Sequence, residues 1–292
     1  MYMSLSIKNR IDRLGANITS YFCQIIIADK MNLFINKIDN KRYNNSIFIV
    51  ILNNLIDYIN NNKKIEKDLT ETKLDTDNWC KLNMSCCTLC KLDIHSYIQD
   101  NFSSFLSNEI KKTTLYKINY NWKKTICVHL RLDDINFTNR IDYDGNISSD
   151  FFKDNINKNN INVSQKDEFE YYRSIGLNSN LNLYNAQSPI KDEKLKPIIQ
   201  KCIEKYPTHE VIIVSSPLGD ITLPYKTIRS NDESFDLYCL IHSDILICSR
   251  STYALAAAYL HMGSEIHIPM WGHFAATGMT SKYDNSKLNY FY

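Results

Sequence analysis

The sequence predicts an α/β protein whose sheets are mostly parallel. Segments with helical periodicity alternate with short, apolar segments rich in β-branched residues, such as "TICVHL" and "VIIVS". These apolar segments lack the alternation of strands that face solvent, and they fit strands covered by helices on both faces. Strand–helix alternation of this kind predicts parallel, doubly wound sheets.

The first part of the chain, residues 1–115, predicts one α/β domain. Residues 4–38 predict a strand, a polar loop, a helix and a strand, because apolar residues recur at helical spacing after Gly15. A second helix is predicted over 46–59. Residues 60–78 are charged and poor in apolar residues, which predicts a surface linker or insertion.

A domain boundary is predicted near residues 110–120, and residues 116–292 form the second α/β domain. Its strands are predicted over 124–132, 209–217, 244–251 and 264–270, and its helices over 192–207, 235–243 and 252–263. The last of these helices is predicted to end at Gly263. Residues 135–165 are rich in Asn and Asp and predict loops.

Composition excludes several classes of protein. A formal net charge of +2 gives no broad cationic field, so a nucleic-acid binder is not indicated. No secretory signal peptide is visible, and the most apolar run, "SIFIVILNNLI", is too short to span a bilayer. We therefore expect a cytoplasmic protein whose nine cysteines are reduced. The many Asn, Ile and Lys residues indicate an AT-rich genome, that of a large DNA virus or a bacterium.

Three of the predicted strands end in polar residues, and open parallel sheets bind ligands at the carboxyl ends of their strands. The first of them is followed by two aspartates, and the third runs into a helix start. The candidate site residues are His129, Arg131, Asp133, Asp134, Ser215, Ser216, Ser249, Arg250, Ser251 and Thr252.

The start of the helix predicted after residue 251 is a candidate anion site. Unpaired N–H groups and a partial positive charge gather at a helix N-terminus, and Ser or Thr hydroxyls add donors. Arg131 would add a bidentate fork for phosphate oxygens. Alternatively, Ser249 or Ser251 is only an N-cap, Arg131 pairs with Asp133 or Asp134, and His129 is a core residue.

Two other motifs have a structural interpretation beside the functional one. Cys80, Cys86, Cys87, Cys90 and His95 could bind zinc, but only Cys87 and Cys90 have C-x-x-C spacing, and buried thiols on a helix are the alternative. The D-x-D of Asp75 and Asp77 follows a charge run, which favours a solvated loop. The sequence contains no P-loop, no G-x-G-x-x-G and no G-x-S-x-G.

Three segments resemble the fucosyltransferase superfamily, which includes the α-1,2-, α-1,6- and protein-O-fucosyltransferases. "VHLRLDD" resembles its H-x-R-R-x-D or H-x-R-x-G motif. "FDLYCLIHSDILICSRSTYALAAAYL" resembles its later motif of an acidic residue, a strand and a Ser-Ser/Thr-aromatic helix start. "DRLGANITSY" resembles its N-terminal R-x-G-N-Q loop. The three stand in family order near both ends of the chain and leave the middle uncovered.

The resemblance implies a GT-B fold, in which two Rossmann-like domains face a cleft. It implies an inverting, metal-independent glycosyltransferase that moves a fucose-like sugar from a nucleoside-diphosphate donor, GDP-linked above all, to a glycan hydroxyl, with no cofactor. Arg131 would neutralise the diphosphate, and the other donor contacts that the resemblance implies are His129, Asp236, Ser251, Thr252, Gly15 and Asn17. The strand-end serines Ser216 and Ser249 are added as donor contacts. The chemistry of the reaction needs a base, for which Asp134 or Asp133 is the candidate; alternatively these aspartates orient Arg131 or bind the sugar hydroxyls.

The chain also departs from the family pattern. The second arginine of the double-Arg motif is Leu132, the family glycine is Asp133, and Asn17 is displaced by one position. A UDP- or GDP-linked pentose or deoxyhexose as donor, as in a xylosyltransferase, is therefore an alternative. A protein that binds a nucleotide or glycan without catalysis is another, and a zinc-dependent interaction module over residues 80–95 is a third.

Overall fold

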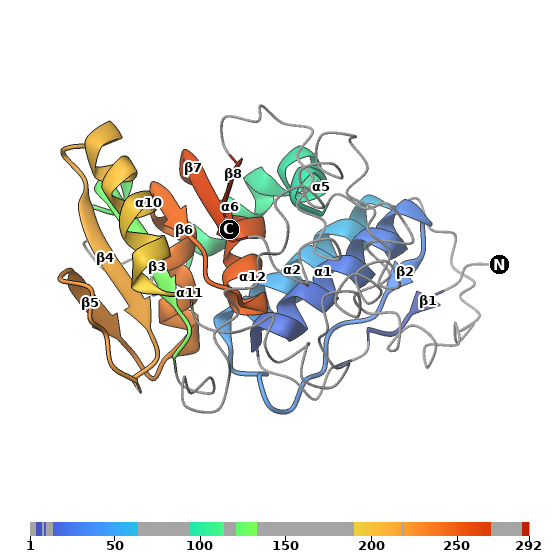
Figure 1. The fold of residues 1–292 in the computed structure, drawn as a ribbon. Helices are drawn as coiled ribbons and strands as arrows, with labels where there is room; N and C mark the ends of the chain where they lie inside the picture. Colours follow the sequence, from blue (N-terminus) through green and yellow to red (C-terminus); the bar gives the residue numbers. More distant parts are fainter. Residues whose placement is uncertain are drawn as a thin grey trace, which may run out of the picture.

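A computed structural model of the chain describes residues 4–7, 9, 14–63, 94–113, 121–132, 190–217, 219–269 and 288–291. Within these ranges the chain is an α/β protein (Figure 1). Asp133 and Asp134, the D-x-D of residues 75–77 and the four cysteines of residues 80–90 lie outside the described residues.

The main sheet has six strands, and every neighbouring pair in it is parallel. The strands are β3 (Thr125–Leu130), β4 (Glu210–Ser215), β5 (Lys226–Arg229), β6 (Ile245–Ile247), β7 (Glu265–Pro269) and β8 (Leu288–Phe291). Their spatial order is β5-β4-β3-β6-β7-β8. This is the 3-2-1-4-5-6 order of doubly wound dinucleotide-binding sheets, and the strand order reverses between β3 and β6. The predicted α/β class with a parallel sheet is confirmed.

Helices cover both faces of this sheet, which explains why its four inner strands are largely apolar. One face packs on α10 (Asp192–Lys205) and carries Ile126 and Val128 of β3. The opposite face carries Cys127 and packs on α11 (Glu233–His242) and α12 (Thr252–Leu260). Figure 1 shows α10 in front of the sheet and α12 beside the N-terminal helices.

The N-terminal part is mainly helical among the residues described. Its helices are α1 (Leu14–Lys30), α2 (Ile47–Asn62), α5 (Ile94–Asn101) and α6 (Ser103–Lys111). Two short strands, β1 (Ser4–Leu5) and β2 (Phe34–Ile35), pair in parallel on either side of α1 in the sequence. The boundary predicted near 110–120 falls between the end of α6 and a 3-10 helix at Trp122–Lys124.

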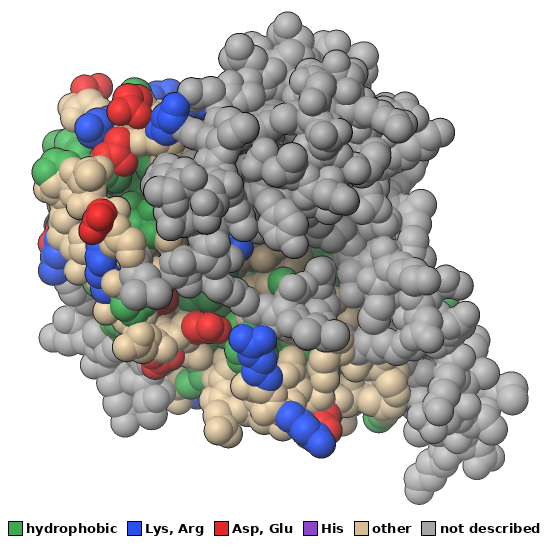
Figure 2. All heavy atoms as spheres, turned by 60° about the horizontal axis from the view of Figure 1, so that its bottom comes forward, with side chains coloured by type: hydrophobic (Ala, Val, Ile, Leu, Met, Phe, Trp, Pro, Cys, Tyr) green, Lys and Arg blue, Asp and Glu red, His purple; other side chains and the backbone are tan. Residues whose placement is uncertain are grey.

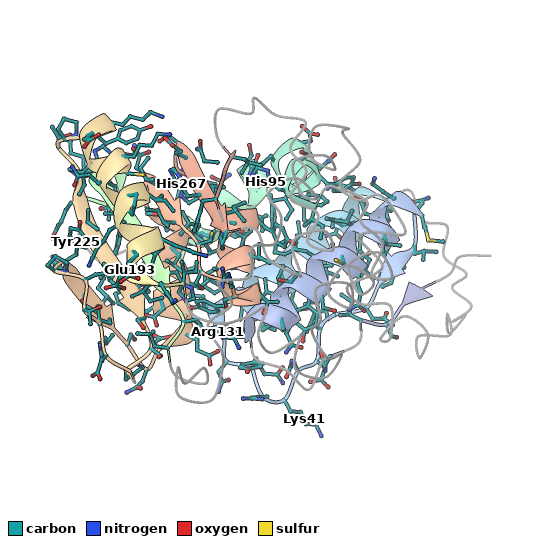
Figure 3. The ribbon with its side chains drawn as sticks, in the orientation of Figure 1. Lys41, His95, Arg131, Glu193, Tyr225 and His267 are labelled. Atoms are coloured by element: carbon teal, nitrogen blue, oxygen red, sulfur yellow. The ribbon has the colours of Figure 1, made fainter. Side chains whose placement is uncertain are left out.

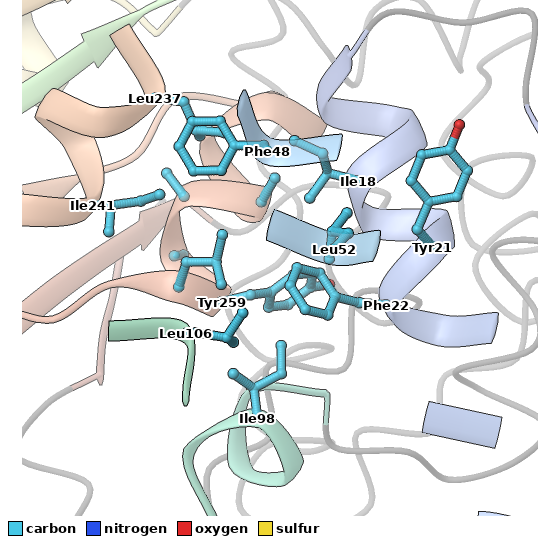
Figure 4. Close-up of a cluster of buried hydrophobic side chains, with 14 of the residues drawn as sticks. Ile18, Tyr21, Phe22, Phe48, Leu52, Ile98, Leu106, Leu237, Ile241 and Tyr259 are labelled. Carbon is cyan, nitrogen blue, oxygen red and sulfur yellow. The ribbon is translucent and has the colours of Figure 1, made fainter. Parts of the chain in front are cut away.

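The N-terminal helices and the sheet domain share one hydrophobic core. Helix α1 is buried nearly all round, because it contacts α12, α2, α5 and β2. Figure 4 shows part of this core, where side chains of the N-terminal helices lie against side chains of α11 and α12; the labelled residues are Ile18, Tyr21, Phe22, Phe48, Leu52, Ile98, Leu106, Leu237, Ile241 and Tyr259. In the part of the chain that is described, the predicted arrangement of two Rossmann-like domains around a cleft is therefore not confirmed.

Gly263 does not end a helix as predicted. Helix α12 already ends at Leu260, and Gly263 follows it at a close approach of two backbone segments. A Cβ on Gly263 would lie 2.2 Å from the carbonyl oxygen of Ser243 and 2.3 Å from that of Asp244. Glycine is needed here because a side chain has no room, and not because the helix needs a left-handed cap.

Acidic and basic side chains are interspersed on the face in Figure 2, in keeping with the formal net charge of +2. Among the helices that the structure describes, none is both long and apolar enough to cross a bilayer.

Candidate functional site

The candidate site lies at the carboxyl end of β3, where the strand order reverses. Side chains alternate along a strand, so His129 points to the same face as Cys127, the face covered by α11 and α12. Arg131 lies two residues further along and remains partly exposed. Figure 3 labels Arg131 at the lower edge of the sheet, on the side of the N-terminal helices.

His129 is held by two residues that follow β6. Its Nδ1 atom lies 2.6 Å from Ser249 Oγ, and its ring centroid lies 5.5 Å from that of Tyr253. Burial and, to a smaller extent, the positive charge of Arg131 together lower the pKa of His129 to about 3. His129 is therefore neutral at physiological pH, and Arg131 carries the positive charge at this end of β3.

Helix α12 begins beside these two residues. Its N-cap is Ser251, whose hydroxyl oxygen accepts a hydrogen bond of 3.1 Å from the backbone N–H of Tyr253. Ser251 is therefore an N-cap. Thr252 is the first helical residue. The remaining N–H groups of this first turn carry the partial positive charge of a helix N-terminus toward the end of β3.

The first turn of α1 packs directly on the first turn of α12. A Cβ on Gly15 would lie 2.3 Å from Tyr253 Cα and 2.7 Å from Tyr253 N, so only a glycine allows this approach. The hydroxyl of Thr19 lies 3.5 Å from the carbonyl oxygen of Thr252. Two helix N-termini from opposite ends of the sequence therefore meet at the reversal of strand order.

Asn17 belongs to a buried polar network and not to a loop. It lies inside α1, is 0% exposed, and its Oδ1 lies 3.0 Å from the hydroxyl of Tyr21. The Asn40 amide donates a hydrogen bond of 2.7 Å to the same hydroxyl. The resemblance implied that Gly15 and Asn17 line a loop near the sugar, whereas both occupy the first turn of a helix. Gly15 remains next to the site, while Asn17 is enclosed.

Asp236 lies in the first turn of α11 and is buried, with 8% of its surface exposed. Its Oδ1 atom is buried and accepts no hydrogen bond from the described residues. Burial and, to a smaller extent, the negative charges of Asp232 and Glu233 together raise the pKa of Asp236 to about 7. The Tyr253 hydroxyl donates to the Glu233 carbonyl oxygen, which joins the starts of α11 and α12.

Two candidate serines lie at the end of the neighbouring strand, β4, which pairs with β3. Ser215 is the last residue of β4 and pairs with Leu130, and Ser216 follows it. The Ser215 hydroxyl is buried without a hydrogen-bond partner among the described residues. Side-chain alternation turns Ser215 toward α10, on the face opposite His129, and Ser216 follows it at the end of the strand. Of these two serines, only Ser216 can point to the side of Arg131 and α12.

The structure thus brings together residues that the sequence placed at three strand ends. His129, Ser249, Ser251 and Thr252 meet around the start of α12, and Gly15 reaches them from α1. Arg131 lies two residues beyond His129, close enough for its charge to lower the pKa of that histidine. A guanidinium, a helix N-terminus and hydroxyl groups in one place form an environment that favours an anion such as a phosphate.

Of the five residues in the zinc hypothesis, only His95 belongs to the part of the chain that the structure describes. It lies in α5 and is 1% exposed. No group of three or more side chains that could hold a metal ion occurs among the described residues.

Two residues at the site are not among those that the sequence predicts. Tyr253 contacts the His129 ring and Gly15, and Thr19 lies beside Thr252. Tyr253 could have been found, because it directly follows the predicted helix start. No signal in the sequence indicates that α1 packs on α12.

Comparisons with protein-family models, with curated proteins and with solved structures found no match to this chain.

Proposed function

We propose that this protein is a glycosyltransferase that moves a fucose-like sugar from a nucleoside-diphosphate donor, GDP-linked above all, to a hydroxyl group of a glycan. The observation that carries the proposal is the convergence of Arg131, neutral His129 and the start of α12 where the strand order reverses. Doubly wound sheets bind nucleotides at this position. The three motifs that resemble fucosyltransferases include these residues, and that resemblance supports the choice of reaction.

In the proposed reaction, the acceptor hydroxyl oxygen attacks the anomeric carbon of the donor sugar. The bond between that carbon and the diphosphate oxygen breaks, and the hydroxyl proton passes to a base, for which Asp134 or Asp133 is proposed. Negative charge grows on the leaving diphosphate, so donors that are already in place lower the barrier. Arg131 would supply a bidentate fork, and the first turn of α12 would supply backbone N–H groups.

A nucleotide-binding protein without transferase activity is the second candidate, and one observation favours it. Leu132 stands where the family has its second arginine, and it packs against the loop after β4. A Cβ on Gly219 would lie 2.6 Å from Leu132 Cβ. This position therefore supplies hydrophobic packing in place of a second positive charge on the diphosphate.

A thermal-shift panel with GDP, UDP and their sugar conjugates tests the binding step, with and without a chelator. A ligand that binds only the folded state raises the melting temperature. We expect a shift with GDP or UDP that survives the chelator. The nucleotide that gives a shift is then used, as its sugar conjugates, in a transfer assay that follows nucleotide release. Binding without release would select the second candidate, and no shift from any nucleotide would overturn both.

Arg131→Ala tests the assigned anion site, and Arg229→Ala is its matched control. Arg229 ends β5, at the same edge of the sheet but two strands away from the reversal of strand order. Loss of a charge-assisted hydrogen bond predicts nucleotide affinity about 10- to 100-fold weaker for Arg131→Ala. Arg229→Ala should bind as the wild type does. Full turnover by Arg131→Ala would contradict the role of Arg131.

A further inference from the structure

We infer that Ser249 is a positioning residue: it holds His129 in the tautomer whose proton is on Nε2, so that His129 donates a hydrogen bond to the donor diphosphate. The identity of the ligand rests on the proposed function. The tautomer rests only on the contacts of the two side chains in the protein without ligand.

The geometry of the pair is that of a short, buried hydrogen bond. Ser249 Oγ lies 2.6 Å from His129 Nδ1, and Ser249 and His129 are 4% and 8% exposed. This is the one hydrogen bond that the Ser249 hydroxyl makes among the described residues. The side chain of Ser249 is thus occupied by His129, which assigns it a different task from the direct donor contact predicted from its place at a strand end.

The location of the proton follows from counting donors. If Nδ1 carried it, Nδ1–H would donate to Oγ, and the buried Ser249 hydroxyl proton would have no acceptor among the described residues. A buried donor without a partner is unfavourable, whereas a donor that water can reach is not. If the hydroxyl donates to Nδ1, the serine proton is satisfied. The ring proton then lies on Nε2, which is not among the buried side-chain atoms of the described residues that lack a partner. The second arrangement is therefore favoured, and the ring proton lies on Nε2.

Neutrality of the ring makes the choice of tautomer matter. Burial and the neighbouring Arg131 charge keep His129 uncharged at physiological pH, so the ring has a single proton to offer. Nε2 makes no hydrogen bond to the described residues, and it lies on the ring opposite the bond to Ser249. An ionised diphosphate accepts hydrogen bonds and has none to donate. Only the tautomer with a proton on Nε2 can bind it.

Histidine-selective NMR tests the tautomer directly. The 15N shifts of a ring distinguish a protonated nitrogen from an unprotonated one, and His129→Gln assigns the signals of this ring among the seven histidines. We expect the wild-type protein without ligand to show Nε2 protonated and Nδ1 unprotonated. We expect Ser249→Ala to show a mixture of both tautomers, and Ser249→Thr, which keeps the hydroxyl, to restore the wild-type pattern.

Nucleotide binding then tests whether this tautomer contributes to affinity. The nucleotide is GDP, or UDP if UDP is the one that shifts the melting temperature. Loss of one neutral hydrogen bond predicts about 5- to 10-fold weaker affinity for Ser249→Ala, with recovery in Ser249→Thr. Ser243→Ala is the matched control. Its hydroxyl is also buried and lies 3.4 Å from a histidine nitrogen, that of His261, but it precedes β6 at the opposite end of the strand. Ser243→Ala should lower stability without changing nucleotide affinity.

The outcomes separate this inference from the proposed function. A wild-type ring protonated on Nδ1, or a Ser249→Ala ring with an unchanged tautomer, would overturn the inference whatever the protein binds. An ordered Nε2–H tautomer without any nucleotide binding would support the role of Ser249 in setting the ring, and would refute the diphosphate as its ligand. Equal loss of affinity in Ser243→Ala and Ser249→Ala would show a general effect of stability and would overturn the positioning role.

Discussion

Gly15 and Tyr253 lie in backbone contact, and a Cβ on Gly15 would come within 2.3 Å of Tyr253 Cα. This contact fixes the start of α1 against the start of α12, the helix whose N-terminus faces the proposed diphosphate. The position of the start of α12 therefore depends on a glycine more than 200 residues away from it in the sequence.

Gly15→Ala should destabilise the protein by about 3 kcal/mol or more, because it overpacks a site where the neighbouring atoms are backbone. Chemical denaturation measures the loss. The clash is with Cα and N, so Tyr253→Ala in the same chain should not rescue it. Rescue by that second substitution would show that the tyrosine side chain, and not the backbone, sets the limit.

Asp236→Asn should stabilise the protein at alkaline pH more than at acidic pH. The pKa of Asp236 rises from 3.8 to about 7 on folding, so the folded state binds the proton more tightly. Stability due to this group is present below pH 4 and is lost as the pH rises toward 7. We expect a gain about 1–2 kcal/mol larger at pH 8 than at pH 5. Asp220→Asn, at an exposed loop residue, is the control and should show no such difference.

Arg131→Gln should raise the pKa of His129, because the arginine charge is the second cause of its depression. Burial is the larger cause, so the pKa should stay below 6.5. The folded pKa lies below the unfolded one, so stability due to His129 is lost as the pH falls from 6.5 toward 3. NMR titration measures the shift. His242, whose pKa is lowered to about 4 by burial and Lys111, should not respond to Arg131→Gln.

Ser251→Ala and Asp232→Ala should separate two roles of an N-terminal helix turn, which are stabilising the helix and binding the nucleotide. Each residue is an N-cap whose side chain accepts a backbone N–H, so each loss should destabilise the protein by about 1 kcal/mol. Only Ser251 begins the helix that faces Arg131. Isothermal titration should show weaker nucleotide binding for Ser251→Ala alone. Equal binding by the two variants would argue that the start of α12 does not hold the ligand.

Much of the sheet domain could be predicted from the sequence, because its strands are continuous apolar runs. β3, β4, β6 and β7 fall within predicted strands, and α10, α11 and α12 within or near predicted helices. β5 was not predicted because "KTIR" is a polar, partly exposed edge strand, and β8 is only "LNYF". Edge strands lose the apolar pattern because one side of them has no neighbour.

The candidate site could be predicted as separate strand ends but not as contacts. His129 and Ser249 are 120 residues apart, and their hydrogen bond depends on the strand order, which no local pattern encodes. The approach of α1 to α12 was missed for the same reason. Apolar residues on every side of α1 do indicate a helix enclosed on all sides, and that signal could have argued against an open cleft above it.

Because the N-terminal helices and the sheet domain share one core, that core stays incomplete until the ribosome has made α12. α1 leaves the ribosome early, but α12, which covers one part of its surface, is made near the end of the chain. At about 5–20 residues per second the delay is on the order of 10 to 45 s. Throughout that interval the nascent chain exposes the apolar side chains of α1 that α12 later covers. A ribosome-bound chain halted before residue 252 should therefore recruit chaperones that a completed chain does not need.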